Sequence, residues 1–278
     1  MFPPAFTVKP GDPASASLLR FLAVRLGLSN HKAKALLDAR RVFVNGRRVW
    51  MARHRLSPGD RVAVQAAPEG GPVLSRRAIL YRSADFLVAD KPPGLLSNGP
   101  HSLESALRAM LEDKALTAVH RLDRDTSGCL LLARNAAAEA AIRPLFERRQ
   151  IQKSYEAVVA GRMADRERVI EYPIDGLSAR TRIRVLASGA LASHLRIELE
   201  TGRTHQIRRH LLAIGHPVIG EPLYAPRREV SARERAVPRH MLHAAELGFR
   251  EPGSGRQVRA AAPRPADFQA CLQRYGLA

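Results

Sequence analysis

Residues 116–133 read LTAVHRLDRDTSGCLLLA, in which the polar segment 120–128 separates two apolar runs. The runs 116–119 and 129–133 have the composition of buried strands, whereas Asp, Thr, Ser and Gly at 123–128 are typical of a turn. The pattern predicts a hairpin that carries Asp123 on its connecting loop. Two carboxylates and two arginines crowd into that loop, which is an unusual density of charge between buried strands.

A structural role would explain an isolated acidic residue in such a turn. Asp125 and Thr126 can cap the turn through their side chains, and Asp123 can pair with Arg121 or Arg124. The loop alone therefore assigns no chemistry to Asp123, and other segments of the chain must decide between the two interpretations.

A second charged segment, residues 195–211, begins with alternating residues and changes to helical periodicity after Gly202. We expect a strand followed by a helix, with Thr204 as the N-cap and Arg208 in the first turns. A guanidinium stays protonated and can bind a carboxylate through two parallel hydrogen bonds, so it would keep a nearby Asp ionised. A phosphate-binding or solvated arginine is the alternative.

Composition favours a nucleic-acid partner. The chain has 278 residues, 45% of them hydrophobic, and its 45 Lys and Arg against 26 Asp and Glu give a formal charge of +19. No apolar run approaches the roughly 18 residues of a spanning helix, so we expect no membrane partner. A general arginine bias of the source proteome is the alternative explanation of the charge.

The cysteines and histidines form no metal or disulfide pattern. Cys129 and Cys271 lie far apart, and the start of the chain has no apolar leader, which favours a reducing, cytoplasmic setting. The ten His show no zinc-site spacing, so we expect no metal.

The sequence divides into a small first domain at 14–65, a Gly- and Pro-rich linker at 66–76 and a larger domain at 77–278. In the first, Ser15 and Ser29 are expected to cap two helices, and a turn at Asn45-Gly46 joins two strands before a third at 61–64. In the larger α+β domain we expect strands at 79–81, 86–90 and 154–159, and helices near 103–111 and 136–149.

The first domain resembles a known RNA-binding module. The pattern LLRFLAVRLGLSNHKAKALLDARRVFVNGRRV at 18–49, followed by LSPGD at 56–60, is similar to the S-four-like, or alpha-L, domain of ribosomal and RNA-modifying proteins. The resemblance implies a small α/β domain whose basic side chains contact RNA phosphates. A solvated basic face is the alternative. The residues concerned are His31, Lys32, Lys34, Arg40, Arg41 and Arg47.

The larger domain resembles the RluA-type pseudouridine synthases. The matching segments are HRLDRDTSG at 120–128, KSYEAVV at 153–159, TGRTHQIRRHL at 201–211, RHMLHA at 239–244 and APRP at 262–265. The resemblance implies a mixed, mainly antiparallel sheet and an isomerase that converts uridine in RNA to pseudouridine without cofactor or metal. The first domain favours ribosomal RNA as the partner, with transfer RNA as the other possibility, and we expect a monomer.

The same resemblance implies a role for each matching residue. Asp123 is the nucleophile, which attacks either the sugar or the base, and Arg208 is its ion-pair partner. Tyr155 stacks on the target base and brings a hydroxyl near the proton-transfer step, while Arg121 fills the gap that the flipped base leaves. Ile207 forms a wall of the uracil pocket. Contacts to RNA or support of the loop are expected from His120, Arg124 and Arg203.

Two departures from the family pattern are visible. GEPLYA at 220–225 stands where an Asp and a Gly are usual, which we interpret as affecting a structural turn alone, and the short interval between Gly94 and His120 reduces any loop that selects substrates. A non-catalytic RNA-binding or ribosome-assembly factor, which would not need Asp123, stays the alternative. A metal-dependent nuclease using Asp123 and Asp125 lacks further clustered carboxylates.

Overall fold

The protein forms two compact units, Met1–Val73 and Leu74–Ala278, in a computed structural model. The structure describes residues 5–12, 17–38, 41–65, 74–224, 232–235 and 237–278. Each unit has its own apolar core.

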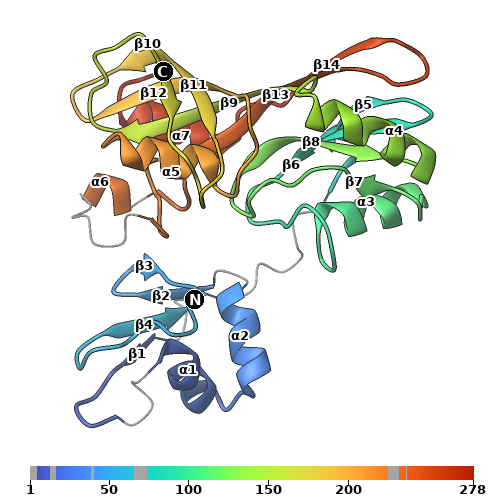
Figure 1. Ribbon diagram of the computed structural model, residues 1–278. Coiled ribbons are helices and arrows are strands. Elements are labelled where there is room, and N and C mark those ends of the chain that lie inside the picture. Colours follow the sequence, from blue (N-terminus) through green and yellow to red (C-terminus); the bar gives the residue numbers. More distant parts are fainter. Residues whose placement is uncertain (1–4, 13–16, 39–40, 66–73, 225–231, 236) are drawn as a thin grey trace. The chain divides into compact units, whose positions relative to one another are not determined.

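In the described part of the first unit, two helices pack with a four-stranded antiparallel sheet of order β1-β4-β2-β3 (Figure 1). The elements are α1 (Leu18–Leu26), α2 (Asn30–Asp38), β1 (Ala5–Thr7), β2 (Val42–Val44), β3 (Arg47–Arg48) and β4 (Arg61–Val64). Leu18, Phe21 and Leu22 recur at helical spacing, and this stripe of α1 is fully buried in the core.

The predicted helices and the Asn45-Gly46 turn of this unit are confirmed. The cap of α1 is Ser17, which accepts a hydrogen bond from the backbone N–H of Arg20, whereas the expected cap Ser15 lies outside the described residues. Strand β1, which precedes the expected domain start at residue 14, pairs with β4. It was not predicted, because three residues among prolines carry no periodic signal.

In the second unit the described strands form one ten-stranded sheet, with the path β10-β11-β12-β9-β13-β8-β6-β5 and with β14 on β13 and β7 on β8. Every pairing is antiparallel except β13 with β8, so the expected mixed, mainly antiparallel sheet is confirmed. The strands are β5 (Ile79–Arg82), β6 (Phe86–Lys91), β7 (Thr117–Ala118), β8 (Ser127–Ala133), β9 (Gln152–Ala160), β10 (Glu167–Glu171), β11 (Arg180–Ser188), β12 (Ala192–Leu199), β13 (Leu242–Arg250) and β14 (Gln257–Ala261).

Helices cover this sheet, and Figure 1 shows α3 and α4 beside the β6–β8 part and α5 and α7 beside the β9–β12 part. Strand β8 is buried along its whole length, because alternate residues join different apolar clusters. Leu130 and Leu132 join the cluster that contains α3, and Leu131 joins the cluster that contains α4. The helices are α3 (Leu103–Leu111), α4 (Ala136–Glu147), α5 (Gln206–Ala213), α6 (Ala232–Arg235) and α7 (Ala266–Arg274), with a short 3₁₀ turn at Arg76–Ala78.

The parallel pairing of β8 with β13 places the predicted loop at the junction of the two parts of the sheet. Ser127 lies opposite His243, and Gly128 lies opposite Ala244. Gly128 has a φ of +110°, and a Cβ there would collide with the backbone of Ala244, so this position requires glycine. The loop before β8, with Asp123, therefore emerges where β8 meets β13.

Two local expectations for this unit need correction. The run 116–119 forms a strand over Thr117–Ala118 alone. The N-cap of α5 is His205, with no side-chain cap, rather than Thr204. The reason is that the Gln206 side chain accepts hydrogen bonds from the backbone N–H of Arg203, at 3.0 Å, and from the hydroxyl of Thr201, at 2.7 Å, and so orders the approach to the helix itself.

Within the described residues, no helix has the length and apolar character needed to cross a membrane.

Candidate active site

Buried polar contacts fix the loop that carries Asp123 to the rest of the second unit. The hydroxyl of Ser97 accepts from the backbone N–H of Leu122 at 2.9 Å and donates to its carbonyl oxygen at 3.0 Å. The backbone N–H of Thr126 donates to the carbonyl of Asp123 at 3.0 Å, which closes the turn. The Asp123 side chain is 26% exposed, so a rigid backbone presents a solvent-accessible carboxylate.

A buried lysine joins this loop to the preceding turn. The ammonium of Lys91 has no solvent exposure and donates to the carbonyl oxygens of Pro92, Leu95 and Arg124 at 2.8–3.0 Å. Burial lowers the pKa of Lys91 to about 7. Three carbonyl acceptors thus take the place of water around one cation and hold residues 92–95 against the loop.

The opposite side of the loop is held by the segment 239–244, which the sequence analysis matched to the family pattern. A guanidinium N–H of Arg239 donates to the carbonyl oxygen of Asp125 at 2.8 Å. The hydroxyl of Thr126 and Nε2 of His240 lie 2.9 Å apart. The C-terminal pattern therefore serves to position the loop in this fold.

Asp123 forms an ion pair with Arg208 of α5. One Nη of Arg208 donates to Oδ2 of Asp123 at 2.8 Å, and the Arg208 side chain is 5% exposed. Its Nε and its other Nη each donate to one carboxylate oxygen of Glu221, at 2.6 and 2.8 Å. Although burial opposes charge on both partners, these contacts raise the pKa of Arg208 and lower that of Glu221, so the arginine is fixed as a cation.

Glu221 was missed by sequence reasoning. Our interpretation that the GEPLYA segment affects a structural turn alone is too narrow, because Glu221 orients the arginine that contacts Asp123. The preceding Gly220 has a φ of +76°, and its backbone lies so close to the carbonyl of Arg239 that a Cβ would collide. No spacing rule links a carboxylate on this turn to an arginine on α5, so only the structure reveals the pair.

His205 gives Asp123 a second neighbour that the sequence did not reveal. Its Nε2 lies 3.4 Å from Oδ1 of Asp123, and its Nδ1 lies 2.6 Å from the hydroxyl of Tyr224. The backbone of His205 has a φ of +54°, an uncommon conformation for a residue with a side chain. Burial lowers the pKa of His205, and a neutral ring that accepts from Tyr224 directs its Nε2–H toward Asp123.

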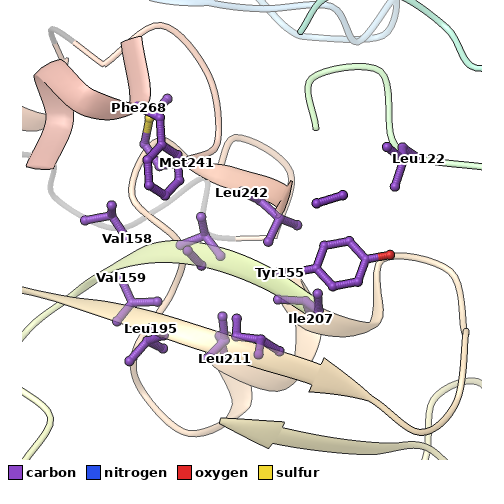
Figure 2. Close-up of a cluster of buried hydrophobic side chains, with 14 of the residues drawn as sticks. Leu122, Tyr155, Val158, Val159, Leu195, Ile207, Leu211, Met241, Leu242 and Phe268 are labelled. Atoms are coloured by element: carbon purple, nitrogen blue, oxygen red, sulfur yellow. The ribbon is translucent and has the colours of Figure 1, made fainter. Parts of the chain in front are cut away.

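Tyr155 of β9 borders the apolar side of the site. It is 8% exposed and belongs to the same buried cluster as Ile207 and Leu242. In Figure 2 its hydroxyl points away from that cluster. Burial, together with the charge of Asp123, raises the pKa of Tyr155, so the hydroxyl stays protonated at neutral pH.

These groups surround a cleft of about 720 Å³ within the second unit. A cleft of this size lies within the roughly 300–1,000 Å³ typical of sites for small organic groups. His205 and Leu242 line it too. Its lining includes all the site residues predicted in this unit, namely His120, Arg121, Asp123, Arg124, Tyr155, Arg203, Ile207 and Arg208.

Among the supporting residues, Arg121 is exposed at the cleft, whereas His120 is turned into the structure. Nε2 of His120 accepts from the backbone N–H of Leu131 at 3.0 Å, and burial lowers its pKa to about 3, so it is neutral. Arg124 donates to the carbonyl of Gly94 at 2.9 Å.

The six residues proposed to contact RNA in the first unit are described in part. His31, Lys32 and Lys34 are exposed on α2. Arg41 is half-buried, and its Nε donates to the carbonyl of Gln65 at 2.8 Å. Arg47 lies in β3, but its side chain, like Arg40 as a whole, lies outside the described residues.

No group of three or more His, Cys, Asp or Glu that could hold a metal ion occurs among the described residues. Cys129 and Cys271 are both buried and free. Burial raises the pKa of Cys129 to about 12 and that of Cys271 to about 11, so neither is a reactive thiolate at neutral pH.

The cleft thus combines a carboxylate bound to a buried arginine with an apolar wall and a protonated tyrosine, parts that suit attack on a nucleoside. Sequence comparison agrees. The family model described as RNA pseudouridylate synthase matches residues 85–213. Ribosomal large subunit pseudouridine synthase C of Escherichia coli (strain K12) is 32% identical, over 95% of this chain and 94% of that protein. An uncharacterized RNA pseudouridine synthase of Chloroflexus aurantiacus is 40% identical over 62% of this chain and 60% of that protein.

Among solved structures, Human RNA Pseudouridylate Synthase Domain Containing 1 is similar with a TM-score of 0.60 and 31% identity, over 70% of this chain and 86% of that one. Fold and sequence together define the class as an RNA-modifying isomerase. The chain belongs to the RNA pseudouridine synthases, in their RluA family.

Proposed function

We propose that this protein converts specific uridines of structured ribosomal RNA to pseudouridine, with Asp123 as the nucleophile. The observation that carries the proposal is the Asp123 carboxylate, which is accessible from the cleft and bonded at 2.8 Å to a buried arginine. An arginine fixed at that distance orients the carboxylate at the cleft through a charge-assisted hydrogen bond.

Isomerisation needs a bond between C1′ of the ribose and N1 of uracil to break, and a bond between C1′ and C5 to form. Asp123 attacks either the ribose or the base and is released at the end, C5 loses its proton, and N1 takes one up. Because uridine and pseudouridine have the same atoms, no other reactant enters the balance. The protonated hydroxyl of Tyr155 is the group we assign to stand near these proton transfers, with its ring against the base.

The target uridine must leave its stack to reach a carboxylate on a cleft wall. We assign Ile207, which is buried beside Tyr155, to a wall of the uracil site. Arg121 is exposed at the cleft, so its guanidinium plane is available to stack in the vacated position. His120, Arg124 and Arg203 support the loops around the cleft through backbone contacts.

Ribosomal RNA is the substrate we favour, with transfer RNA as the other outcome. The support is the +19 charge, the exposed basic residues of α2, and the similarity over nearly the whole chain to a relative named for the large ribosomal subunit. We further propose that residues 14–65 form an S-four-like RNA-binding domain, that 66–76 link it to a catalytic domain at 77–278, and that the protein acts as a monomer in the cytoplasm.

The test has two parts. Purified protein without added metal should convert uridine in total RNA of its host, and mapping of pseudouridines in a deletion strain should show the loss of particular ribosomal RNA positions. Loss confined to transfer RNA would overturn the choice of substrate. Binding of RNA without any conversion would instead favour the non-catalytic alternative, and inhibition by a chelator would contradict the metal-free reaction.

A further inference from the structure

A lysine in the cleft has no assigned role. Lys153 of β9 is half-buried, and its ammonium lies 5.6 Å from the centre of the Phe146 ring and beside Gly202. Among the described residues it forms no ion pair with a carboxylate, and its pKa is lowered by burial. Burial of a cation without an anionic partner costs stability, which raises the question of what the partner is.

The surroundings of Lys153 point to an anion at the cleft. A smaller pocket of about 220 Å³ adjoins the large cleft, since both are lined by Lys153, Gly202 and Arg203. Arg149 lines the smaller pocket as well. Gly202 carries no side chain, and a Cβ there would lie 3.9 Å from the ammonium of Lys153.

Two carboxylates also line the smaller pocket, and neither neutralises Lys153. Glu200 is bonded at 2.9 Å to Arg180, and Glu147 is exposed at the end of α4. The cations on this pocket therefore remain available to an incoming anion.

The position of Lys153 along β9 suggests which anion it meets. Side chains two residues apart lie on the same face of a strand, about 6.6 Å apart, so Lys153 and Tyr155 face the same side. In a nucleotide, the ribose separates the base from the phosphate by a similar distance. If Tyr155 stacks on the uracil, the ammonium of Lys153 is therefore placed to reach a phosphate next to the ribose of that uridine.

We propose that Lys153 binds a phosphate group of the RNA backbone next to the flipped uridine, with Arg149 and Arg203 bordering the same subsite. This inference rests on the proposed function of the cleft. Tyr155 and Lys153 together would hold one nucleotide at its base and at its phosphate, which fixes the ribose between them relative to Asp123. An ammonium suits this task because it binds a phosphate as a point charge from many directions.

The first experiment replaces the charge and keeps the length of the side chain. Lys153→Met in the full-length protein should lower kcat/KM for a short RNA substrate by about tenfold to a hundredfold, the size of one charge-assisted hydrogen bond. Lys153→Arg should keep most of the activity. Lys114→Met is the matched control, because Lys114 is exposed after α3 and lines neither pocket, and its activity should match wild type. The melting temperature of Lys153→Met should equal or exceed that of wild type.

The second experiment removes the charge from the RNA. Substrates with a single methylphosphonate, placed on either side of the target uridine or farther away, are compared in wild type and Lys153→Met. At one flanking position the neutral linkage should reduce wild-type kcat/KM as much as the mutation does, while Lys153→Met should be indifferent to it. The inference would be overturned if the methylphosphonate and the mutation reduced kcat/KM independently at every position. It would also be overturned if Lys153→Met were fully active, or if Lys153→Met and Lys153→Arg were equally inactive. If wild type converts no uridine at all, the proposed function fails instead.

Discussion

Among single residues, the geometry of the site depends on how Arg208 is held. Its guanidinium contacts Asp123 on one side and Glu221 on the other, so one buried cation serves two carboxylates of different exposure. The exposed partner is available for chemistry, and the buried one sets the direction of the arginine. Replacement of Glu221 therefore tests positioning apart from nucleophilic attack.

We predict that Glu221→Gln lowers both stability and activity. Breaking a buried ion pair costs about 3–5 kcal/mol, and we expect the lower end, because Asp123 still compensates Arg208. The variant should show a reduced melting temperature. Its kcat should fall more than its KM changes, because the protein surface that binds the RNA is unchanged. Glu221→Asp, which keeps the charge, should recover part of the kcat. Wild-type stability and turnover in Glu221→Gln would show that the buried pair has no positioning role.

A second residue-scale prediction concerns pH. The pKa of His205 is lowered from 6.5, so the ring is neutral at and above that pH and becomes charged only as the pH falls further. A charged His205 beside Asp123 would weaken the nucleophile that we propose, so kcat/KM should be lost on the acid side of pH 6.5 as the ring titrates. His205→Gln should remove this dependence and reduce activity about tenfold, or roughly 1.4 kcal/mol, because the ring 3.4 Å from Asp123 is lost. Tyr224→Phe, which removes the hydroxyl 2.6 Å from Nδ1 of His205, should perturb the same pH dependence. A pH profile of His205→Gln that matches wild type would contradict the role.

Sequence reasoning reached part of this site. Asp123, Arg208 and Tyr155 could be predicted because each stands in a local motif, and all three line one cleft. His205 stands in the same motif as Arg208. Its contact with Asp123, however, depends on the left-handed backbone conformation of His205, which no sequence pattern predicts. Glu221 was not found because its partner lies on another element.

At the scale of elements, the hairpin loop is positioned by the junction of β8 with β13. Part of the second unit could be predicted from periodicity, namely β5, β6, β8, β9, β12, α3, α4 and α5, since each is encoded within a short window. No expectation covered β10, β11, β13, β14, α6 and α7. The parallel pairing between β8 and β13 joins residues more than a hundred positions apart in the chain, and nothing local specifies it. Gly128 is a local feature of the sequence that the junction requires.

We predict that Gly128→Ala disrupts this junction. The substitution adds both an unfavourable φ of +110° and a collision with the backbone of Ala244, so the strands must separate. Gly253→Ala is the matched control in the same unit, because it has a φ of +86° and open space around its Cα. The control should cost about 1–2 kcal/mol, whereas Gly128→Ala should cost several times more in chemical denaturation and lose activity. Equal effects of the two substitutions would show that the close approach of β8 and β13 is unimportant.

At the scale of the whole molecule, the chain separates into two units with independent cores. The division was visible in the Gly- and Pro-rich segment after residue 65, although the limits of the domains as independent folding units stay a prediction. The first strand could not be foreseen, because its partner β4 lies far along the chain and its own segment is short.

Deletion of residues 1–73 tests the proposed division of labour. The remaining chain should melt cooperatively and keep its active site, while its affinity for RNA falls, most at low salt, because fewer phosphates are neutralised. The slope of log affinity against log salt concentration, measured for both proteins, should be shallower for the shortened one. An unfolded remainder would contradict the independence of the two units, and unchanged affinity would remove the RNA-binding role of the first.

We propose above all that the accessible carboxylate of Asp123 performs the isomerisation. Its most direct test is a single-turnover assay of Asp123→Asn, which keeps the size of the side chain and removes its charge, on an RNA that the wild-type enzyme converts. We expect no pseudouridine above background, and RNA binding within about threefold of wild type, since one charge among many phosphate contacts changes affinity little. Conversion by Asp123→Asn at a rate near that of wild type would contradict this proposal.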